Sequence, residues 1–224
     1  MIKAVIFDLD GTLLDTIEDI TDSLNAALAG DGLRAYTPAE TKMFVGSGVR
    51  TLLERALAHA GRPGAAFEGA KERFLREYAA RRTAKTRPYP GLPEAVDGLR
   101  AMGVKTAVLS NKPQADTLDT VRHYFSLERF DLVYGQREGV PMKPDPAALD
   151  ALIAELGVGK DECLFVGDSD VDMRTAANAG LRKAGVLWGF RPRRELEAHG
   201  ADYLLDDPLS LLDIVRRSGP AGAR

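Results

Sequence analysis

Two clusters of acidic residues each follow a short apolar run, and their spacing suits metal binding or chemistry at a carboxylate. The first contains Asp8 and Asp10, two residues apart and followed at once by Gly11. Side chains two residues apart share one side of a strand, and glycine permits the sharp turn that ends it. A surface turn would show the same residues, so this cluster alone leaves both interpretations open.

The second cluster begins with Asp168, which ends another apolar run, and it reaches Asp172 four residues later. Asp168 or Ser169 could simply cap a following helix. If both runs are strands of one parallel sheet, however, their carboxyl ends lie at one edge, where open sheets bind ligands. Asp8, Asp10 and Asp168 would then repel one another unless a cation lies among them. A few carboxylates, waters and a substrate phosphate are the ligands that Mg²⁺ favours.

Two further segments carry polar side chains that could contact a bound phosphate. Ser110 and Asn111 follow an apolar run and could donate hydrogen bonds, although the same residues before Lys112 and a proline also begin helices. Lys143 lies between prolines, and this rigid context suits a lysine directed inward as a counter-charge for carboxylates and phosphate. For a single lysine, a solvated loop is the simpler interpretation.

Strand-like and helix-like patterns alternate over most of the chain, which predicts βαβ units and a parallel sheet covered by helices. Apolar runs predict strands at residues 2–9, 104–109, 132–134, 163–166, 184–187 and 203–205. Helical periodicity predicts helices at residues 92–102, 114–124, 147–156, 173–179 and 208–215. We therefore expect an α/β fold with a doubly wound, mostly parallel, Rossmann-like sheet.

Residues 16–86 interrupt this alternation, because they show helical periodicity and no convincing strand. Thr37 to Glu40 has the residue types of a capping box, with proline at the first helical position. A helical stretch of this length exceeds what a crossover between two strands needs. The prediction is a core domain formed by residues 1–15 and 87–217, an inserted α-helical cap domain at residues 16–86, and a disordered tail at residues 218–224.

Taken together, four segments occur in order, each after a predicted strand, and they resemble the four motifs of the haloacid dehalogenase-like hydrolase superfamily. They are Asp-x-Asp-Gly-Thr at residues 8–12, Ser-Asn at residues 110–111, Lys-Pro at residues 143–144 and Gly-Asp-Ser-x-x-Asp at residues 167–172. The resemblance extends from residue 6 to about residue 172 and is highly specific as a set. It implies a phosphatase that attacks small phosphorylated metabolites and uses Mg²⁺.

The resemblance also implies a role for each matching residue. Asp8 matches the nucleophile that forms an aspartyl-phosphate, and Asp10 matches the general acid and base. Asp8, the backbone carbonyl of Asp10, and Asp168 match the Mg²⁺ ligands. The remaining matches are an outer-shell carboxylate, two donors to the phosphoryl oxygens and a charge-balancing lysine: Asp172, Ser110 with Asn111, and Lys143.

The helical insert resembles the small mobile cap of this superfamily's first subgroup, which would close over the site and select the substrate. Within it, Gly46, Ser47 and Gly48 could form a tight loop whose N–H groups face an anion at the start of the next helix. An ordinary turn between helices would look the same. In a cap, however, this stretch resembles the specificity loop of phosphoglycolate phosphatases, which implies 2-phosphoglycolate as the substrate. Arg50 is the arginine that we expect to contact it.

Other functions could use similar residues. A β-phosphoglucomutase-like phosphohexose mutase would share the core residues and return the phosphate to the sugar, but the loop around Ser47 favours hydrolysis. A dehalogenase would not need Asp10 as a proton donor, and a pyrophosphatase stays open as an alternative. A phosphorylatable signalling module also pairs acidic residues, Mg²⁺ and a lysine on a doubly wound sheet, but such modules are shorter and carry no helical insert.

The bulk composition limits the partners and the surroundings. A net charge of −3 gives no reason to expect nucleic acid or an anionic membrane, and no apolar stretch is long enough to cross a bilayer. Cys163, the single cysteine, is expected to be a buried core residue. Trp188 is expected to pack rather than to stack on substrate. We expect a cytoplasmic monomer or homodimer whose partner is a small phosphorylated metabolite.

Overall fold

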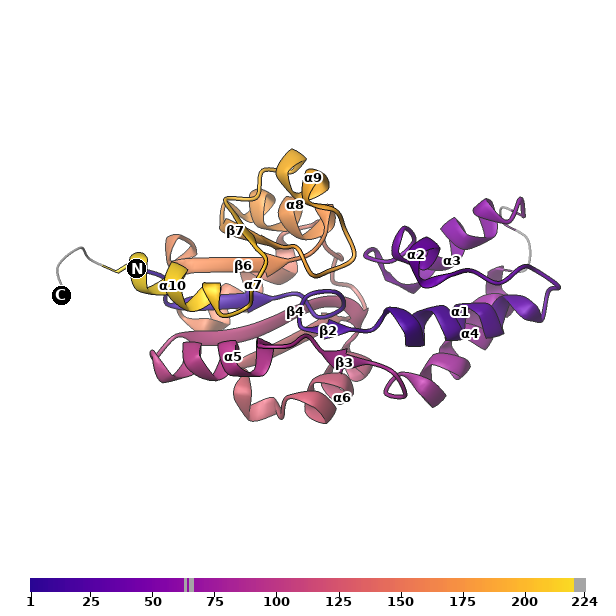
Figure 1. Ribbon diagram of the computed structural model, residues 1–224, viewed down its shortest axis with the longest axis horizontal. Helices are drawn as coiled ribbons and strands as arrows, with labels where there is room; N and C mark the ends of the chain where they lie inside the picture. The colour runs from indigo at the N-terminus through magenta and orange to yellow at the C-terminus, as the bar shows by residue number, and fades with distance from the viewer. Residues whose placement is uncertain (63, 65–66, 220–224) are drawn as a thin grey trace. The chain divides into compact units, whose positions relative to one another are not determined.

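The computed structural model describes residues 1–62, 64 and 67–219, and the chain forms two compact units (Figure 1). The first, here called the core unit, consists of Met1–Leu13 and Pro88–Arg224. The second, the helical unit, consists of Leu14–Arg87. Each unit contains its own cluster of buried apolar residues, so each can be described by itself.

A six-stranded sheet forms the centre of the core unit. Its strands are β1 (Ala4–Phe7), β4 (Lys105–Pro113), β5 (Leu132–Gln136), β6 (Cys163–Gly167), β7 (Arg182–Val186) and β8 (Tyr203–Leu205). They lie in the order β5-β4-β1-β6-β7-β8, and neighbouring strands pair in parallel. From β1 the chain adds β4 and β5 on one side. It then crosses back and adds β6, β7 and β8 on the other side. This arrangement confirms the predicted doubly wound α/β fold.

The central strand β1 is buried along its whole length. It lies between β4 and β6, and helices cover both faces of the sheet, which explains why residues 4–7 form an unbroken apolar run. Phe7 pairs in register with Val108 of β4 and Val166 of β6. Asp8 therefore emerges level with the carboxyl ends of both neighbours, at the edge where open parallel sheets form sites.

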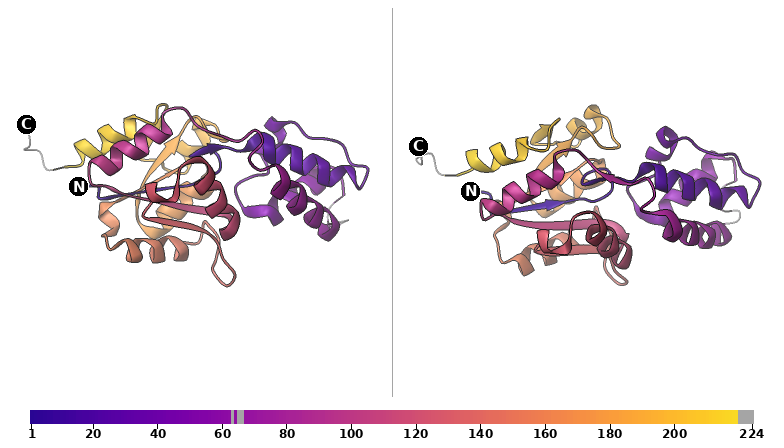
Figure 2. Two further views of the ribbon diagram at one scale, coloured as in Figure 1. Left: turned by 90° about the horizontal axis from the view of Figure 1, so that it is seen from below. Right: turned by 60° about the horizontal axis from the view of Figure 1, so that its bottom comes forward.

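Helices cover both faces of this sheet. They are α5 (Leu92–Ala101), α6 (Gln114–Tyr124), α7 (Ala147–Leu156), α8 (Asp170–Ala179), α9 (Arg193–Ala198) and α10 (Ser210–Arg217), with short 3₁₀ turns at Leu127–Arg129 and Lys160–Glu162. The apolar residues of α7 and α8 join one cluster with alternate residues of β1, such as Ala4 and Ile6. α5 packs against α10, and Figure 2 shows this pair on the opposite side of the sheet from α7.

The helical unit consists of α1 (Ile17–Ala29), α2 (Pro38–Lys42), α3 (Gly48–His59) and α4 (Phe67–Arg81), whose apolar side chains meet in one cluster. α2 begins with the predicted capping box: the Thr37 hydroxyl accepts from the N–H of Glu40, and the Glu40 carboxylate accepts from the N–H of Thr37. Two short strands, β2 (Leu14–Asp15) and β3 (Arg87–Pro88), pair where the chain enters and leaves this unit.

Several boundaries differ from those predicted. β4 runs to Pro113 instead of ending at residue 109, and α9 occupies a segment in which we predicted no helix. α8 begins at residue 170 instead of 173, because the hydroxyl of Ser169 caps it by accepting from the N–H of Asp172. The predicted tail lies outside the described residues from position 220 onward, and Ser218 at its start accepts a hydrogen bond from the N–H of Ile2.

Two expectations drawn from composition can be compared with the structure. Cys163 is fully buried at the start of β6, as expected for a core residue. Its thiol donates to the backbone carbonyl of Gly159 at 3.3 Å, and burial raises the pKa of the Cys163 thiol to about 11. Among the helices that the structure describes, none combines the length and the apolar character needed to cross a membrane.

Candidate active site

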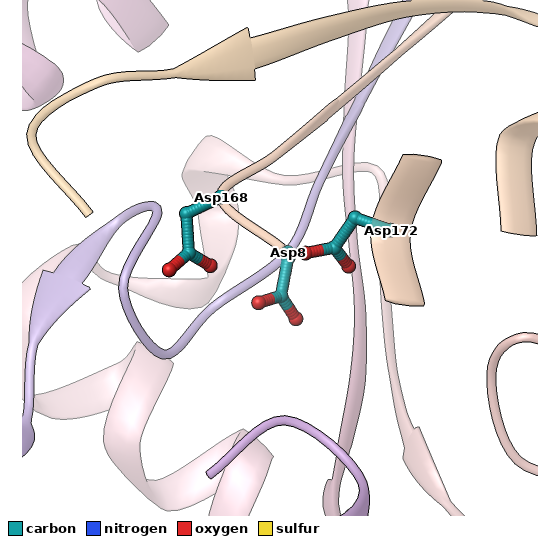
Figure 3. A group of neighbouring side chains, drawn as sticks. All are labelled: Asp8, Asp168 and Asp172. Carbon is teal, nitrogen blue, oxygen red and sulfur yellow. The ribbon is translucent and has the colours of Figure 1, made fainter. Parts of the chain in front are cut away.

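Three buried carboxylates meet at the carboxyl edge of the sheet (Figure 3). Asp8 follows β1, Asp168 follows β6, and Asp172 lies in the first turn of α8. Each offers a carboxylate oxygen, and these oxygens lie within 4.8 Å of one another. The site therefore forms where the strand order reverses around β1, which is the position at which doubly wound sheets bind ligands.

Lys143 supplies positive charge to two of these carboxylates. It lies in the loop between β5 and α7, and its Nζ is 2.7 Å from Oδ1 of Asp8 and 2.7 Å from Oδ1 of Asp172. The side chain of Lys143 is 3% exposed, so water screens these ion pairs only weakly. The loop between prolines thus holds this lysine inside the site rather than in solvent.

The buried carboxylates carry more negative charge than Lys143 balances. Burial raises the pKa of Asp8 to about 7; the charge of Asp172 adds to this rise and Lys143 opposes it. Burial, together with the charges of Asp172 and Asp8, raises the pKa of Asp168 well above its usual range. Burial alone would lower the pKa of Lys143, but the two flanking carboxylates outweigh it and raise that pKa. A divalent cation beside these carboxylates would favour their charged forms.

Asp168 is held in a close-fitting cradle formed by two turns that contain glycine. The N–H of Phe190 donates to its Oδ2 at 2.7 Å, and the Thr12 hydroxyl donates to its Oδ1 at 3.4 Å. A Cβ at Gly189 would lie 2.3 Å from the Cβ of Asp168, and one at Gly11 would lie 2.4 Å from its Oδ2. Gly11 also has a φ of +92°, which other residues rarely adopt. Both glycines are needed for the carboxylate to lie where it does.

Trp188 fixes the turn that follows β1. Its indole N–H donates to the backbone carbonyl of Thr12 at 3.0 Å, and its ring centroid lies 6.4 Å from that of Tyr89. This is the packing role that we expected from the sequence. Sequence reasoning missed the two residues that follow, Gly189 and Phe190, because their segment matches no motif and a lone glycine in a loop is a weak signal.

Both oxygens of Asp172 have partners within the protein. Oδ1 contacts Lys143, and Oδ2 accepts from the N–H of Ser169 at 3.1 Å and from its hydroxyl at 2.6 Å. A carboxylate engaged in this way suits the support of metal ligands better than direct binding of the metal.

Ser110, Asn111 and Lys112 lie at the carboxyl end of β4, where the strand is irregular. Beyond Leu109, four steps along β4 match two steps along β5, so β4 bulges there. All three residues are buried, as are residues 106–109 before them.

Asn111 lies at the site, but its side chain contacts the protein. Its Nδ2 donates to the backbone carbonyl of Lys143 at 3.0 Å, and its Oδ1 accepts from the N–H of Lys143 at 2.9 Å. The amide therefore positions the lysine loop, a task that sequence reasoning did not foresee. The hydroxyl of Ser110 accepts from the N–H of Lys112 at 3.2 Å and still has its own O–H to donate.

Asp10 has a different partner from the three clustered carboxylates. The Nζ of Lys112 lies 2.6 Å from its Oδ1 and 2.8 Å from its Oδ2. The side chain of Lys112 is 5% exposed and that of Asp10 is 15% exposed. Sequence reasoning missed this lysine, because its place before a proline looked like the start of a helix. Its adjacency to Ser110 and Asn111 was the one signal that could have revealed it.

The donor set fits a hard divalent cation. It consists of buried carboxylates, and carboxylate oxygens suit Mg²⁺ or Mn²⁺ better than softer metals. Asp8 and Asp168 come from neighbouring strand ends, so they can share an ion that keeps water and a phosphate oxygen among its ligands. The structure thus supports a divalent metal at this position.

The residues predicted to recognise the substrate in the cap lie in the helical unit. Gly46 and Gly48 have φ values of +117° and +78°, and Ser47 lies between them at the start of α3. Arg50, in the first turn of α3, forms an exposed ion pair with Glu54 at 3.3 Å. Its contact with substrate, and that of the loop, stay predictions.

Comparison with known proteins identifies the family. The sequence matches the haloacid dehalogenase-like hydrolase family over residues 5–186. A phosphoglycolate phosphatase from Cereibacter sphaeroides is 39% identical over 217 residues, covering 95% of this chain and 97% of that protein. The crystal structure of a candidate phosphoglycolate phosphatase from Lactobacillus delbrueckii subsp. bulgaricus is 35% identical with a TM-score of 0.91, covering 95% of this chain and 98% of its own. The crystal structure of CbbY from Rhodobacter sphaeroides in complex with phosphate is 25% identical with a TM-score of 0.79, covering 94% of this chain and 96% of the CbbY chain.

The doubly wound sheet with carboxylates and a lysine at its carboxyl edge is the arrangement that the four motifs predicted. The chain belongs to the haloacid dehalogenase-like hydrolase family. The resemblance seen in the sequence is thus confirmed at the level of the family.

Proposed function

We propose that this chain is a Mg²⁺-dependent phosphatase that hydrolyses 2-phosphoglycolate through an aspartyl-phosphate on Asp8. The observation that carries the proposal is the position of Asp8: its carboxylate lies beside Asp168 and is held at 2.7 Å by the buried ammonium of Lys143. A carboxylate fixed between a cation site and an ammonium is oriented to attack a phosphorus atom whose oxygens those same charges hold.

In the first step, an oxygen of Asp8 attacks the phosphorus and the bond between phosphorus and the ester oxygen breaks. Asp10 gives its proton to that departing oxygen, so the alcohol leaves in neutral form. Lys143 and the hydroxyl of Ser110 hold the phosphoryl oxygens during the transfer. The contacts of Asn111 with the backbone of Lys143 keep the ammonium at the required position.

In the second step, water attacks the phosphorus of the aspartyl-phosphate and the bond to the Asp8 oxygen breaks. Asp10, now a carboxylate, takes the proton of that water. Inorganic phosphate leaves, and Asp8 and Asp10 return to their starting forms. Asp10 thus serves as the acid in the first step and as the base in the second, because the attacking water takes the place that the departing alcohol had.

The metal would be held by the carboxylates of Asp8 and Asp168 and by the backbone carbonyl of Asp10, with Asp172 behind them. When bound, Mg²⁺ neutralises charge on the phosphoryl oxygens and on the attacking carboxylate. The cradle of Gly11, Gly189 and Phe190 keeps Asp168 directed to that place.

The choice of substrate rests on relatives and on the helical unit. Proteins named phosphoglycolate phosphatase cover nearly the whole chain at 35–39% identity, and the related CbbY structure contains phosphate. We propose that the helical unit is the cap, and that the loop at residues 46–48 and Arg50 bind the leaving group of the substrate.

The test is phosphate release from a panel of phosphorylated metabolites, with Mg²⁺ and with a chelator. The panel contains 2-phosphoglycolate, hexose phosphates, phosphoserine, nucleoside monophosphates and pyrophosphate, and the Asp8→Asn variant serves as the matched control. We expect a preference for 2-phosphoglycolate that disappears with the chelator and in the variant.

Other outcomes separate the parts of this proposal. Metal-dependent release from another ester would keep the mechanism and overturn the substrate. Interconversion of glucose phosphates without net release would show a mutase. Full activity of Asp8→Asn would overturn the mechanism.

A further inference from the structure

Lys112 is a second buried lysine at the carboxyl edge of the sheet. Its ammonium contacts both carboxylate oxygens of Asp10, at 2.6 and 2.8 Å. A single contact would leave the carboxylate free to rotate about its last bond, but contacts to both oxygens fix its rotation as well as its position. The pair is well shielded, since the Lys112 side chain is only 5% exposed.

The backbone of Lys112 is itself anchored from two sides. Its N–H donates to the hydroxyl of Ser110 at 3.2 Å, and its carbonyl accepts from the hydroxyl of Thr117 in α6 at 3.1 Å. Lys112 lies in the stretch after Leu109 where the pairing of β4 with β5 is irregular, next to the end of the strand. A lysine with so well fixed a backbone can hold its partner within the narrow range that proton transfer needs.

Lys143 cannot perform this task for Asp10. Its ammonium lies between Asp8 and Asp172, 2.7 Å from an oxygen of each. The two buried lysines therefore have different partners: Lys143 contacts Asp8 and Asp172, and Lys112 contacts Asp10.

We propose that Lys112 is a positioning residue for proton transfer by Asp10. It holds the Asp10 carboxyl group where a proton can pass to the departing ester oxygen and, in the second step, from the attacking water. This inference rests on the proposed function, because it requires Asp10 to act as the acid and base of a phosphatase.

Two other roles make different predictions and can be told apart. If the ion pair only supported the fold, its loss would slow all substrates alike. If Lys112 instead bound a negative charge on the substrate, its loss would raise KM and would do so whether or not Asp10 were present. A positioning role requires that the loss depend on how much the leaving group needs a proton, and that it vanish when Asp10 is absent.

The experiment compares an alkyl ester with an activated ester. The alkoxide that leaves 2-phosphoglycolate, or the alkyl ester that the panel prefers, must be protonated, whereas p-nitrophenyl phosphate releases a stable phenolate that needs no acid. The variants are Lys112→Met, Lys112→Arg, Asp10→Asn and the double variant of Lys112→Met with Asp10→Asn. Lys105→Met is the matched control, since Lys105 lies on the same strand at its far end and contacts the carbonyl of Leu156.

We expect Lys112→Met to lower kcat on the alkyl ester by about tenfold or more, part of the roughly 10²–10⁴-fold that a general acid contributes. On p-nitrophenyl phosphate the loss should be below about threefold, and KM should change little. In the Asp10→Asn background, adding Lys112→Met should change kcat by less than about twofold, because the two residues act as one unit. Lys112→Arg should recover part of the activity, and Lys105→Met should match the wild type.

Equal losses on both esters, or losses that add in the double variant, would overturn the role of Lys112. A rise in KM that persists without Asp10 would also overturn it, in favour of a substrate-binding lysine. If Lys112→Met fails to fold, as its melting temperature would show, Lys112→Gln takes its place in the same comparisons. If the wild-type protein releases phosphate from neither ester, the proposed function fails instead, so the two failures are distinct.

Discussion

The ammonium of Lys143 lies 2.7 Å from an oxygen of Asp8, although 135 positions separate the two residues in the chain. The fold joins them by placing the loop after β5 over the end of β1, and Asn111 of β4 holds that loop by its backbone. The position of the attacking group therefore depends on three separate strand ends. Removing either charged partner changes the electrostatics of the site as well as its shape.

Replacing Lys143 by methionine should remove the charge that orients Asp8 and that faces the phosphoryl group. We expect kcat to fall by about 10²-fold or more, the range for loss of one preorganised electrostatic contact, and to fall alike on alkyl and activated esters. Phosphate release by the purified variant provides the measurement. Lys143→Arg should not restore the rate, because a forked guanidinium does not replace a compact ammonium between two carboxylates. Wild-type turnover in either variant would contradict the assigned role.

Asp8→Asn should abolish turnover while the protein stays folded, because the side chain keeps its shape and loses its nucleophilic oxygen. Phosphate release and far-ultraviolet circular dichroism would be measured on the same sample. If the variant lost both its activity and its structure, the result would not show that Asp8 is the nucleophile. Asp8→Glu therefore provides a second test. Its carboxylate is displaced by one methylene, and we expect it to be folded and at least about 10²-fold slower, since small misplacements of reacting groups are costly.

The contribution of Asp8 to the stability of the metal-free protein should fall as the pH rises toward neutrality. Burial raises the pKa of Asp8 from its ordinary 3.8 to about 7, so the folded state binds more protons than the unfolded state between those values. A raised pKa in the folded state gives stability that is complete below the unfolded value and is lost as the pH passes through about 7.

This dependence is measured as the free energy of unfolding at several pH values in the presence of a chelator. Asp8→Asn is the reference, because it lacks the titrating group and keeps the rest of the protein. The wild type should lose stability relative to this variant between about pH 5 and about pH 8. These two values lie on either side of the raised pKa of Asp8. Mg²⁺ should restore the wild type more at pH 8 than at pH 5, because the metal requires ionised ligands. A difference that does not change with pH would refute the prediction.

Gly189→Ala should weaken the response to Mg²⁺. The added Cβ would lie 2.3 Å from the Cβ of Asp168, so the carboxylate must move from its place between Gly11 and Phe190. Loss of such support around a metal ligand typically costs about 10–100-fold in metal affinity or activity. The Mg²⁺ concentration for half-maximal phosphate release would be measured for both proteins. An unchanged value would show that the cradle does not position Asp168 for a metal.

The sheet and the family could be predicted because their signals are local. Residues 4–7 form an unbroken apolar run since both faces of β1 are covered, and the motifs that begin at Asp8 and near Asp168 each follow such a run. The capping box of α2 could also be predicted, because Thr37 and Glu40 are only three positions apart in the sequence. The meeting of Asp8 and Asp168 then followed from the topology of parallel strands, whereas the third carboxylate of the cluster is Asp172 of α8 and not Asp10, which pairs with Lys112.

The contacts that sequence reasoning missed are long-range and come from irregular backbone. Lys112 reaches Asp10 across 102 positions of the chain, from the irregular end of β4, and neither feature leaves a periodic signature. Phe190 reaches Asp168 through its backbone N–H, so its side chain carries no trace of the contact. The pairing of Asn111 with the backbone of Lys143 was not foreseen, because it depends on a loop that no pattern could place, and its contact with a phosphate stays a prediction.

The burial of Cys163 has a practical consequence. A thiol whose pKa is raised to about 11 holds almost no thiolate at neutral pH, and the thiolate is the form that maleimides attack. Exposed positions such as Met43 of the helical unit and Met102 of the core unit could therefore be changed to cysteine and coupled to dyes, while the native sulfur stays unlabelled. Energy transfer between a donor dye on one unit and an acceptor on the other would follow their separation in real time as substrate is added and consumed.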